Sequence, residues 1–541
     1  MNISVACVEG AAVVGCTVLI STSASGDGPA LNLGQDLGAT VLYFVVGQLL
    51  LVGQLLLLDT ASKFFHPLSV QHAAPLQEVQ AGSEAQAAGE TPAGGEASSR
   101  PSFSTQISSV GEDGSTNVAA GLSYGLELVV TALLIAIPIR VGYSLLAAVI
   151  WVCTMLLVVM PLVHLFADKL MLRTASAADN ILVHQNWGAA LLIGVVKVSF
   201  TLVANGVYQQ NCSVAAGASA YSDCNQEDLP AAAELGERLF HAAVPDIFKF
   251  HSLVDAFVLL ALLLSAKLML WLRMTLRQGV GAARGLMDSF SLDEYLISRS
   301  NNAVAVSLAG YIVAVAMVLA GVIDCPDDNV GMHGLWVVVY TSFGMLLLFC
   351  AQQINQRVLL RSIDNSQALL DNNVAVACVE AGSLVACGRI MQAVLSGSSD
   401  SVEEGFATIL LYWVSGQLIL LLFFVCYRIA TTGFNVEAQV KEGNVAVGLS
   451  TGLTLVAVSF VITSPILKYS SYLVFLLVSV TGIVLLILLR VVVDRVVLPG
   501  DTLDGEMLQQ NWGAALIEGA AAFSIAIVLD IFQYAPEDNV C

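Results

Sequence analysis

The chain has 541 residues, of which 57% are hydrophobic and only 12% are charged. Soluble domains carry about 25% charged residues, so these proportions exclude an ordinary soluble protein and indicate a polytopic membrane protein. The net charge of −21 argues against nucleic acid as a partner, because acidic loops repel phosphates. We therefore expect the lipid bilayer to be the main partner of this chain.

A membrane-spanning helix needs roughly 20 mostly apolar residues, and thirteen runs in the sequence fit this description. In chain order they cover residues 3–20, 39–58, 118–138, 143–166, 187–207, 253–272, 303–323, 335–351, 374–394, 406–427, 445–466, 472–493 and 512–532. They do not alternate in polarity as the strands of a membrane barrel do. The expected fold class is all-α, a polytopic transmembrane helical bundle of about 13 spans.

Seven of these runs open with an asparagine, and this repetition predicts the architecture. The asparagines are Asn2, Asn117, Asn186, Asn302, Asn373, Asn444 and Asn511. The eighth residue after each of them is Gly or Ala. Helices of this Asn type alternate with Leu-rich helices, so that two hairpins make one four-helix unit.

Tandem four-helix units follow from this alternation. We expect a lone Asn-type helix at 1–25, units at 39–207, 251–397 and 405–535, a disordered loop at 66–116 within the first unit, and an outer loop at 208–250. The loop 66–116 is rich in Ala, Gly, Ser and Glu and cannot bury enough surface to fold. Because the array starts and stops in mid-pattern, either the chain is truncated or the array begins and ends on an Asn-type helix.

Lys and Arg gather in the loops that precede the Asn-type helices, whereas the opposite loops are acidic. The positive-inside rule then places the N-terminus on the cytosolic side and the C-terminus on the outer side, with the identity of the membrane left open. Cys212 and Cys224 share the outer loop and are a candidate disulfide if the outer compartment is oxidising. No basic stretch precedes the first apolar run, so we expect no cleavable signal peptide.

Acidic residues within the spans are the main functional candidates. Glu9, Glu380 and Glu518 each lie seven residues after their Asn, about two turns or 10 Å along the same helix face. Ionisable groups inside a membrane are functional candidates by default. The alternative is that these side chains only hold helices together through hydrogen bonds. Glu127 and Lys197 lie about three turns deep in their helices, and an ion pair between them would fix packing.

Two further patterns favour structural roles. Asn is a preferred N-cap, because its side-chain oxygen accepts a free backbone N–H; the functional alternative is that several Asn amides line a polar vestibule. Gly121 with Gly125 and Gly448 with Gly452 form GxxxG patterns, which let membrane helices approach closely. We therefore expect the Asn-type helices to form an inner layer and the Leu-rich helices to face lipid.

The sequence contains no Walker motif, GxSxG or HExxH. The seven His residues are scattered, and neither they nor the Cys residues follow metal-ligand spacing. We therefore expect no enzymatic activity, no cofactor and no metal site.

The paired Asn-x-Ala openings resemble those of the domain-of-unknown-function 350 family of small bacterial inner-membrane proteins. The matching stretches are Asn117–Ile137 with Asn186–Val207, Asn302–Ile323 with Asn373–Val394, and Asn444–Ile466 with Asn511–Phe532. Members of that family are single four-helix units, so this chain differs by fusing more than three. The resemblance implies the architecture and carries over no catalytic residue.

Two functions fit these observations. The first is ion, proton or small-solute transport or a channel, along a polar path marked by Glu9, Glu127, Lys197, Glu380 and Glu518. The second is a structural membrane subunit or scaffold, in which the same residues stabilise helix packing. Other membrane subunits or further copies of the chain are candidate partners in both cases. The uneven occurrence of the Glu among the repeats argues against a symmetric pore.

Overall fold

The computed structural model describes residues 117–141, 145–171, 180–181, 184–217, 294–323, 330–396, 402–431, 433–468, 472–492 and 503–532. Their regular elements are all helices. Eight of these helices are long and apolar enough to cross a membrane, and Tyr472–Leu488 and Trp512–Ile527 are shorter apolar helices. The predicted spans 3–20, 39–58 and 253–272 lie outside the described residues, as do Asn2, Glu9, the loop 66–116 and Cys224.

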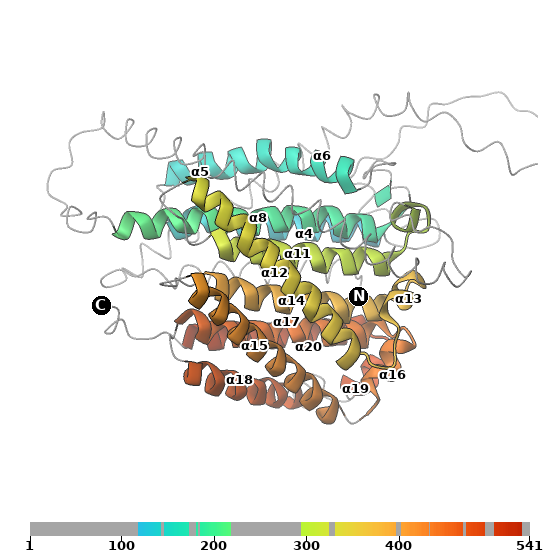
Figure 1. Ribbon diagram of the computed structural model, residues 1–541. Helices are drawn as coiled ribbons and strands as arrows, with labels where there is room; N and C mark the ends of the chain where they lie inside the picture. Colours follow the sequence, from blue (N-terminus) through green and yellow to red (C-terminus); the bar gives the residue numbers. More distant parts are fainter. Residues whose placement is uncertain are drawn as a thin grey trace, which may run out of the picture. The chain divides into compact units, whose positions relative to one another are not determined.

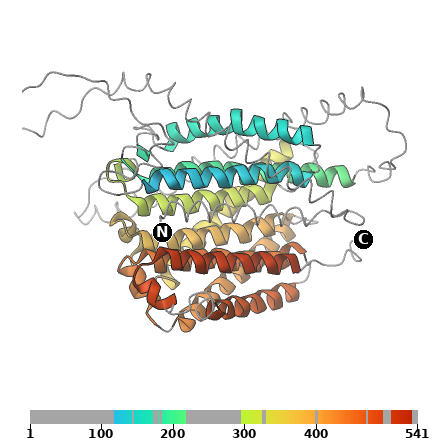
Figure 2. The same ribbon diagram turned by 180° about the vertical axis from the view of Figure 1, so that it is seen from behind.

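Six Asn-type helices form an inner layer in the described part of the chain. They are α4 (Val118–Val141), α8 (Trp187–Gly217), α11 (Asn302–Ile323), α14 (Val374–Leu395), α17 (Val445–Lys468) and α20 (Trp512–Phe532). Each packs along the next one in chain order, and Figures 1 and 2 show them as a row from two sides. Contact between α8 and α11 is as extensive as contact within the predicted units, so the inner layer continues across the unit boundary.

Leu-rich helices form an outer layer. The described ones are α12 (Val330–Val358), α15 (Val402–Ala430) and α18 (Tyr472–Val492), together with a continuous segment of α5 (Leu145–Thr154), the π-helix η2 (Met155–Val159) and α6 (Met160–Met171). Each of α12, α15 and α18 packs on the two inner helices that flank it in sequence. In Figure 1, α12 and α15 cross in front of the inner row. Where the return between two inner helices is described, from α4 to α8 and from α11 to α20, it passes through the outer layer, so those inner helices run in the same direction.

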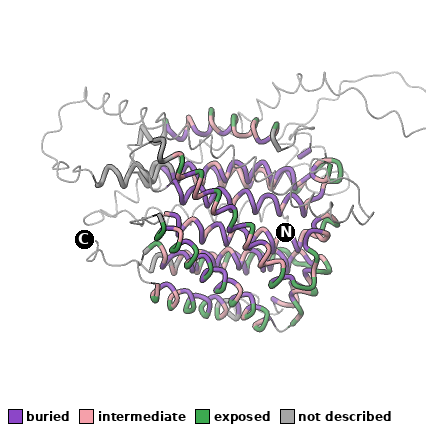
Figure 3. The backbone as a smooth tube through the Cα atoms, viewed as in Figure 1, coloured by how far each residue is buried: buried purple, intermediate pink, exposed green. Residues whose placement is uncertain are grey.

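Burial distinguishes the middle of the inner layer from the outer helices. In the apolar window of each helix, 94% of the residues are buried on α11 and 72% on α14 and α17, compared with 33% on α12, whereas α4 and α15 are equal at 50%. Large apolar side chains such as Leu473 and Leu477 remain exposed on α18, as the outward edges in Figure 3 show. Exposing so much apolar surface to water would be unfavourable, whereas contact with lipid acyl chains is not.

Glycine and alanine bring the inner helices into backbone contact. A Cβ atom added to Gly448 on α17 would lie 2.5 Å from the carbonyl oxygen of Ala375 on α14, and one added to Gly310 on α11 would lie 2.5 Å from the Cα of Ala381. Gly452 on α17 faces the backbone of Cys378 with equally little space. Gly121 and Gly125 are buried on α4. Helices this close leave no room for a water-filled channel between them at these contacts.

A tight turn precedes each described inner helix from α8 to α20. These turns contain the π-helical turn η4 (Glu294–Ser298) and the short helices α13 (Asn365–Leu370), α16 (Val436–Lys441) and α19 (Leu503–Leu508). The three short helices lie on one side of the inner layer, at the N-terminal ends of its helices (Figure 1). The residue just before the capping Asn has a positive φ in all five turns: Gln185, Ser300, Asn372, Gly443 and Gln510. After α13, α16 and α19 this residue closes a Schellman motif, for example with Asn372 N–H bonded to the carbonyl of Leu369 at 3.1 Å.

The capping asparagines also join neighbouring repeats. The side-chain oxygen of Asn373 accepts from Val376 N–H at 3.1 Å and so caps α14. Its Nδ2 atom donates across to the carbonyls of Val440 and Lys441, in the turn that precedes α17. The same relation recurs along the row: Asn186 to Leu296, Asn301 to Leu369, and Asn444 to Met507, each at 2.9 Å. We call this series of bonds the asparagine ladder.

One predicted cap is wrong. Asn301, and not Asn302, caps α11, because its side chain accepts from Val304 N–H at 2.9 Å. Ser300 takes the left-handed conformation, which places the cap one residue later, at Asn301. Asn302 instead accepts from Gly188 N–H at 3.1 Å and thereby caps the neighbouring helix α8.

The ends and the regularity of two predicted spans also differ. Helix α8 runs on to Gly217, past the predicted end at 207, and so takes in Cys212, whose side chain is not described. In the span predicted at 143–166, η2 interrupts the α-helix just before Pro161. Proline has no N–H to donate within the helix, and a π-turn is one of the ways in which a helix accommodates such a break.

We predict that Gly448→Leu destabilises the protein by about 1–3 kcal/mol or more, because the new side chain must displace the backbone of α14. Ala407→Leu is the matched control, since Ala407 is exposed on α15. The unfolding midpoint of each variant in detergent measures the effect. Equal midpoints for the two variants would contradict close packing at Gly448.

The asparagine ladder is tested by Asn444→Ser. Serine still caps a helix but cannot reach the carbonyl of Met507, and a buried acceptor left unpaired costs about 1–3 kcal/mol. Asn511→Ser is the control, because Asn511 caps the last inner helix and bonds only within its own turn in the described contacts. If both substitutions lower the unfolding free energy equally, capping alone accounts for the asparagines.

Candidate functional site

The first candidate site is centred on Glu380, two turns into α14. The side chain is 5% exposed. Its Oε1 atom accepts from Ser307 Oγ on α11 at 2.7 Å and from Gln352 Nε2 on α12 at 3.1 Å. Its Oε2 atom accepts from Asn365 Nδ2 on α13 at 3.4 Å. In these described contacts, four helices supply one carboxylate and three uncharged donors.

The second candidate site is centred on Glu518, two turns into α20. The side chain is 3% exposed and pairs with Arg490 of α18, whose Nη1 lies 2.5 Å from Glu518 Oε1. Ser450 on α17 donates to the other carboxylate oxygen. Arg490 also lies 2.6 Å from Asp504 at the start of α19 and stacks over the ring of Tyr427 at 4.5 Å. This carboxylate thus belongs to a buried ionic network.

The two sites occupy the same register of the repeat. Gln352 precedes Glu380 by 28 residues, and Arg490 precedes Glu518 by 28 residues. Ser307 and Ser450 each lie six residues after the Asn that caps their helix. In both repeats the outer helix therefore donates to the carboxylate from the equivalent position. The donor is the amide of Gln352 in one repeat and the guanidinium of Arg490 in the other.

A small cavity lies beside each carboxylate. The cavity at Glu518, lined also by Tyr427 and Arg490, has a volume of about 20 Å³. The cavity at Glu380 has about 10 Å³ and is lined also by Gln352, Asn355 and Asn365. Such volumes hold about one water-sized particle. The sites can therefore hold a single small guest, and neither cavity is large enough for an organic solute.

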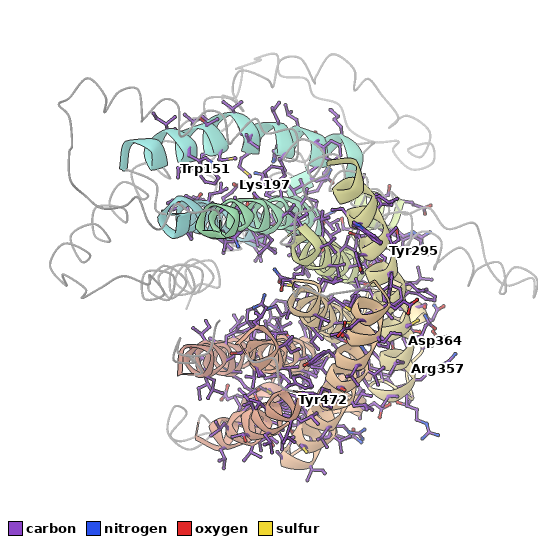
Figure 4. The ribbon with its side chains drawn as sticks, turned by 60° about the vertical axis from the view of Figure 1, so that its left-hand side comes forward. Trp151, Lys197, Tyr295, Arg357, Asp364 and Tyr472 are labelled. Atoms are coloured by element: carbon purple, nitrogen blue, oxygen red, sulfur yellow. The ribbon has the colours of Figure 1, made fainter. Side chains whose placement is uncertain are left out.

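Glu127 and Lys197 form a third polar cluster, which lies deeper than the other two. Lys197 on α8 is buried and forms an ion pair with Glu127 on α4. Lys197 lies on the side of α8 that faces the segment α5–η2–α6, which carries Trp151 (Figure 4). Glu127 Oε2 is buried without a hydrogen-bond partner among the described residues. This pair spans α4 and α8, so the predicted path residues that the structure describes fall in separate helix interfaces.

Outside the spans, Glu437 of α16 connects the turn after α12 to the inner layer. It accepts from Ser362 N–H at 2.7 Å, and its carboxylate lies 3.9 Å from Arg428. Burial by itself raises the pKa of Glu437, but this hydrogen bond and the charges of Arg428 and Arg361 outweigh burial and lower the pKa below its ordinary value.

Sequence reasoning missed the residues that surround the carboxylates. Gln352, Asn365 and Arg490 were not among the candidates, although Gln352 and Arg490 both lie 21 residues before the next capping Asn. That constant spacing was the available signal. Among the described residues, no group of three or more His, Cys, Asp or Glu side chains is placed to hold a metal ion.

We predict that Arg490→Gln lowers the unfolding free energy by about 3–5 kcal/mol, because it leaves buried carboxylates without their cation. The double variant Arg490→Gln/Glu518→Gln should recover much of this loss, since it imitates the neutral donors at Glu380. Chemical unfolding in detergent measures both. A double variant no more stable than the single variant would show that the pair does not act as a unit.

Comparison with known proteins places the chain in a family. The family model for the Domain of Unknown Function (DUF350) matches three times, over residues 105–208, 252–395 and 401–531. No curated protein and no solved structure matches the chain. Each match covers all or most of two consecutive inner helices, namely α4 and α8, α11 and α14, and α17 and α20. This integral membrane protein therefore belongs to the DUF350 family, in the form of a tandem fusion of its units.

Proposed function

We propose that this protein moves protons or small monovalent cations across a membrane, with Glu380 as the main carrying group. The observation that supports the proposal is the recurrence of a buried carboxylate beside a water-sized cavity, at one register in two repeats. A carboxylate inside a membrane is costly and marks ion and proton pathways in many membrane proteins. We propose no catalytic role.

The position of the carboxylate suits exchange with one aqueous side. Glu380 lies seven residues beyond Asn373, about 10 Å along the helix. The proposed orientation places this end of the inner layer on the cytosolic side, in keeping with the Lys and Arg residues of the nearby loops. Glu518 is held by Arg490, so we assign it a smaller part in exchange.

A structural scaffold is the second candidate function. Its support is the asparagine ladder together with the backbone contacts at Gly310, Gly448 and Gly452, which join the described inner helices into one continuous layer. In this alternative the buried carboxylates fix the packing of outer helices on inner ones, and further membrane subunits or copies of the chain would bind to the assembled layer.

Flux into proteoliposomes separates the two functions. We expect the full chain to conduct protons or Na⁺ or K⁺ above the rate of protein-free liposomes, and Glu380→Gln to reduce the flux to that background. Glu403→Gln is the control, because Glu403 is an exposed acid in the first turn of α15. A parent protein without flux under a pH gradient or either cation gradient would leave only the scaffold function.

A further inference from the structure

We propose that the cavity beside Glu380 is a binding site for one small monovalent cation of about the size of Na⁺, held by the carboxylate and by side-chain amide and hydroxyl oxygens. The inference deepens the proposed function, and its consequence for transport rests on that function. The existence of the site can be tested without any flux.

The first support is an unused ligand atom at the cavity. Asn365 lines the cavity and is 4% exposed. Its Nδ2 atom donates to Glu380, but its Oδ1 atom is buried without a hydrogen-bond partner among the described residues. Buried polar atoms are seldom left unpaired. A carbonyl oxygen beside a carboxylate requires a donor or a cation as its partner.

The second support comes from the equivalent site at Glu518. There the outer helix places the guanidinium of Arg490 directly against the carboxylate. The repeat architecture therefore accommodates a positive charge at this register. At Glu380 the corresponding residue is Gln352, a neutral amide, and Ser366 takes the place of Asp504. The outer helix therefore offers Glu380 an amide where it offers Glu518 a guanidinium, and both sites keep the carboxylate.

The ligand chemistry indicates which cation fits. Glu380, Asn365, Asn355 and Ser383 line the cavity and supply oxygen atoms, and hard cations prefer oxygen ligands. One carboxylate balances one positive charge, which favours a monovalent ion over Ca²⁺ or Mg²⁺. The cavity volume of about 10 Å³ admits one water molecule or one ion of similar size. An ion that must keep its hydration shell is therefore excluded.

The test measures the thermal stability of the full chain in detergent with NaCl, LiCl, KCl or choline chloride at constant ionic strength. A ligand that binds only the folded state raises the melting temperature. We expect Na⁺ or Li⁺ to raise it by about 2 °C or more relative to choline, and K⁺ to raise it less. Equal melting temperatures in all four salts would overturn the proposal.

Three variants locate the effect. Glu380→Gln should abolish the dependence on Na⁺, and Glu403→Gln should retain it. Gln352→Arg should imitate Arg490, supply its own cation, and give a melting temperature that is independent of Na⁺. If Gln352→Arg does not fold, Asn365→Ala provides the same test, because loss of Oδ1 should shift the stabilisation to higher Na⁺ concentrations. A Na⁺ dependence that survives Glu380→Gln would place the ion elsewhere and refute the site.

Other outcomes are equally decisive. A melting temperature that changes with pH but not with Na⁺ would show that Glu380 takes up a proton and not a metal cation. This result would overturn the cation site and leave proton transport possible. Na⁺-dependent stability without flux would support the site and refute the transport function. Flux without Na⁺-dependent stability would refute the site and support the transport function.

Discussion

The structure depends on how parallel membrane helices satisfy the backbone N–H groups at their N-terminal ends. Four such groups lack partners in every helix, and a bilayer provides no water to replace them. Four capping asparagines pair one of these groups and also bond the neighbouring turn: Asn186, Asn301, Asn373 and Asn444. The oxygen of Asn373 caps α14, and its nitrogen bonds the turn that introduces α17. A single amide therefore closes one helix and fixes the position of the next.

Backbone contact between the inner helices follows from this arrangement. Once the turns are joined at one end, Gly and Ala along the helices allow the backbones to meet, as at Gly448 and Ala375. Van der Waals packing of this kind is the main attraction available between apolar helices in lipid. It leaves little room for large polar side chains within the inner row. Polar groups instead lie where an outer helix packs against two inner helices.

The three polar clusters show how one frame accepts different chemistry. At the Glu380 register one repeat surrounds the carboxylate with amides and a serine, and another pairs Glu518 with Arg490. In the first pair of inner helices the charges are Glu127 and Lys197, about one turn deeper. The frame is set by asparagine and glycine, so the side chains inside it are free to vary. Function then depends on individual sites rather than on the fold.

The sequence alone determined the helical membrane class, the two kinds of helix and the tandem repeat, because hydropathy, capping and small-residue patterns act through local chemistry. It also placed Glu380 and Glu518 at equal depth, since depth is a simple count along a helix. Only the tertiary structure decided that Asn301 caps α11, that four of the capping asparagines bond the turn before the next inner helix, and that Gln352 and Arg490 face the carboxylates. Those contacts join separate helices, and their partners depend on how the helices are rotated and aligned against one another, which no local pattern specifies.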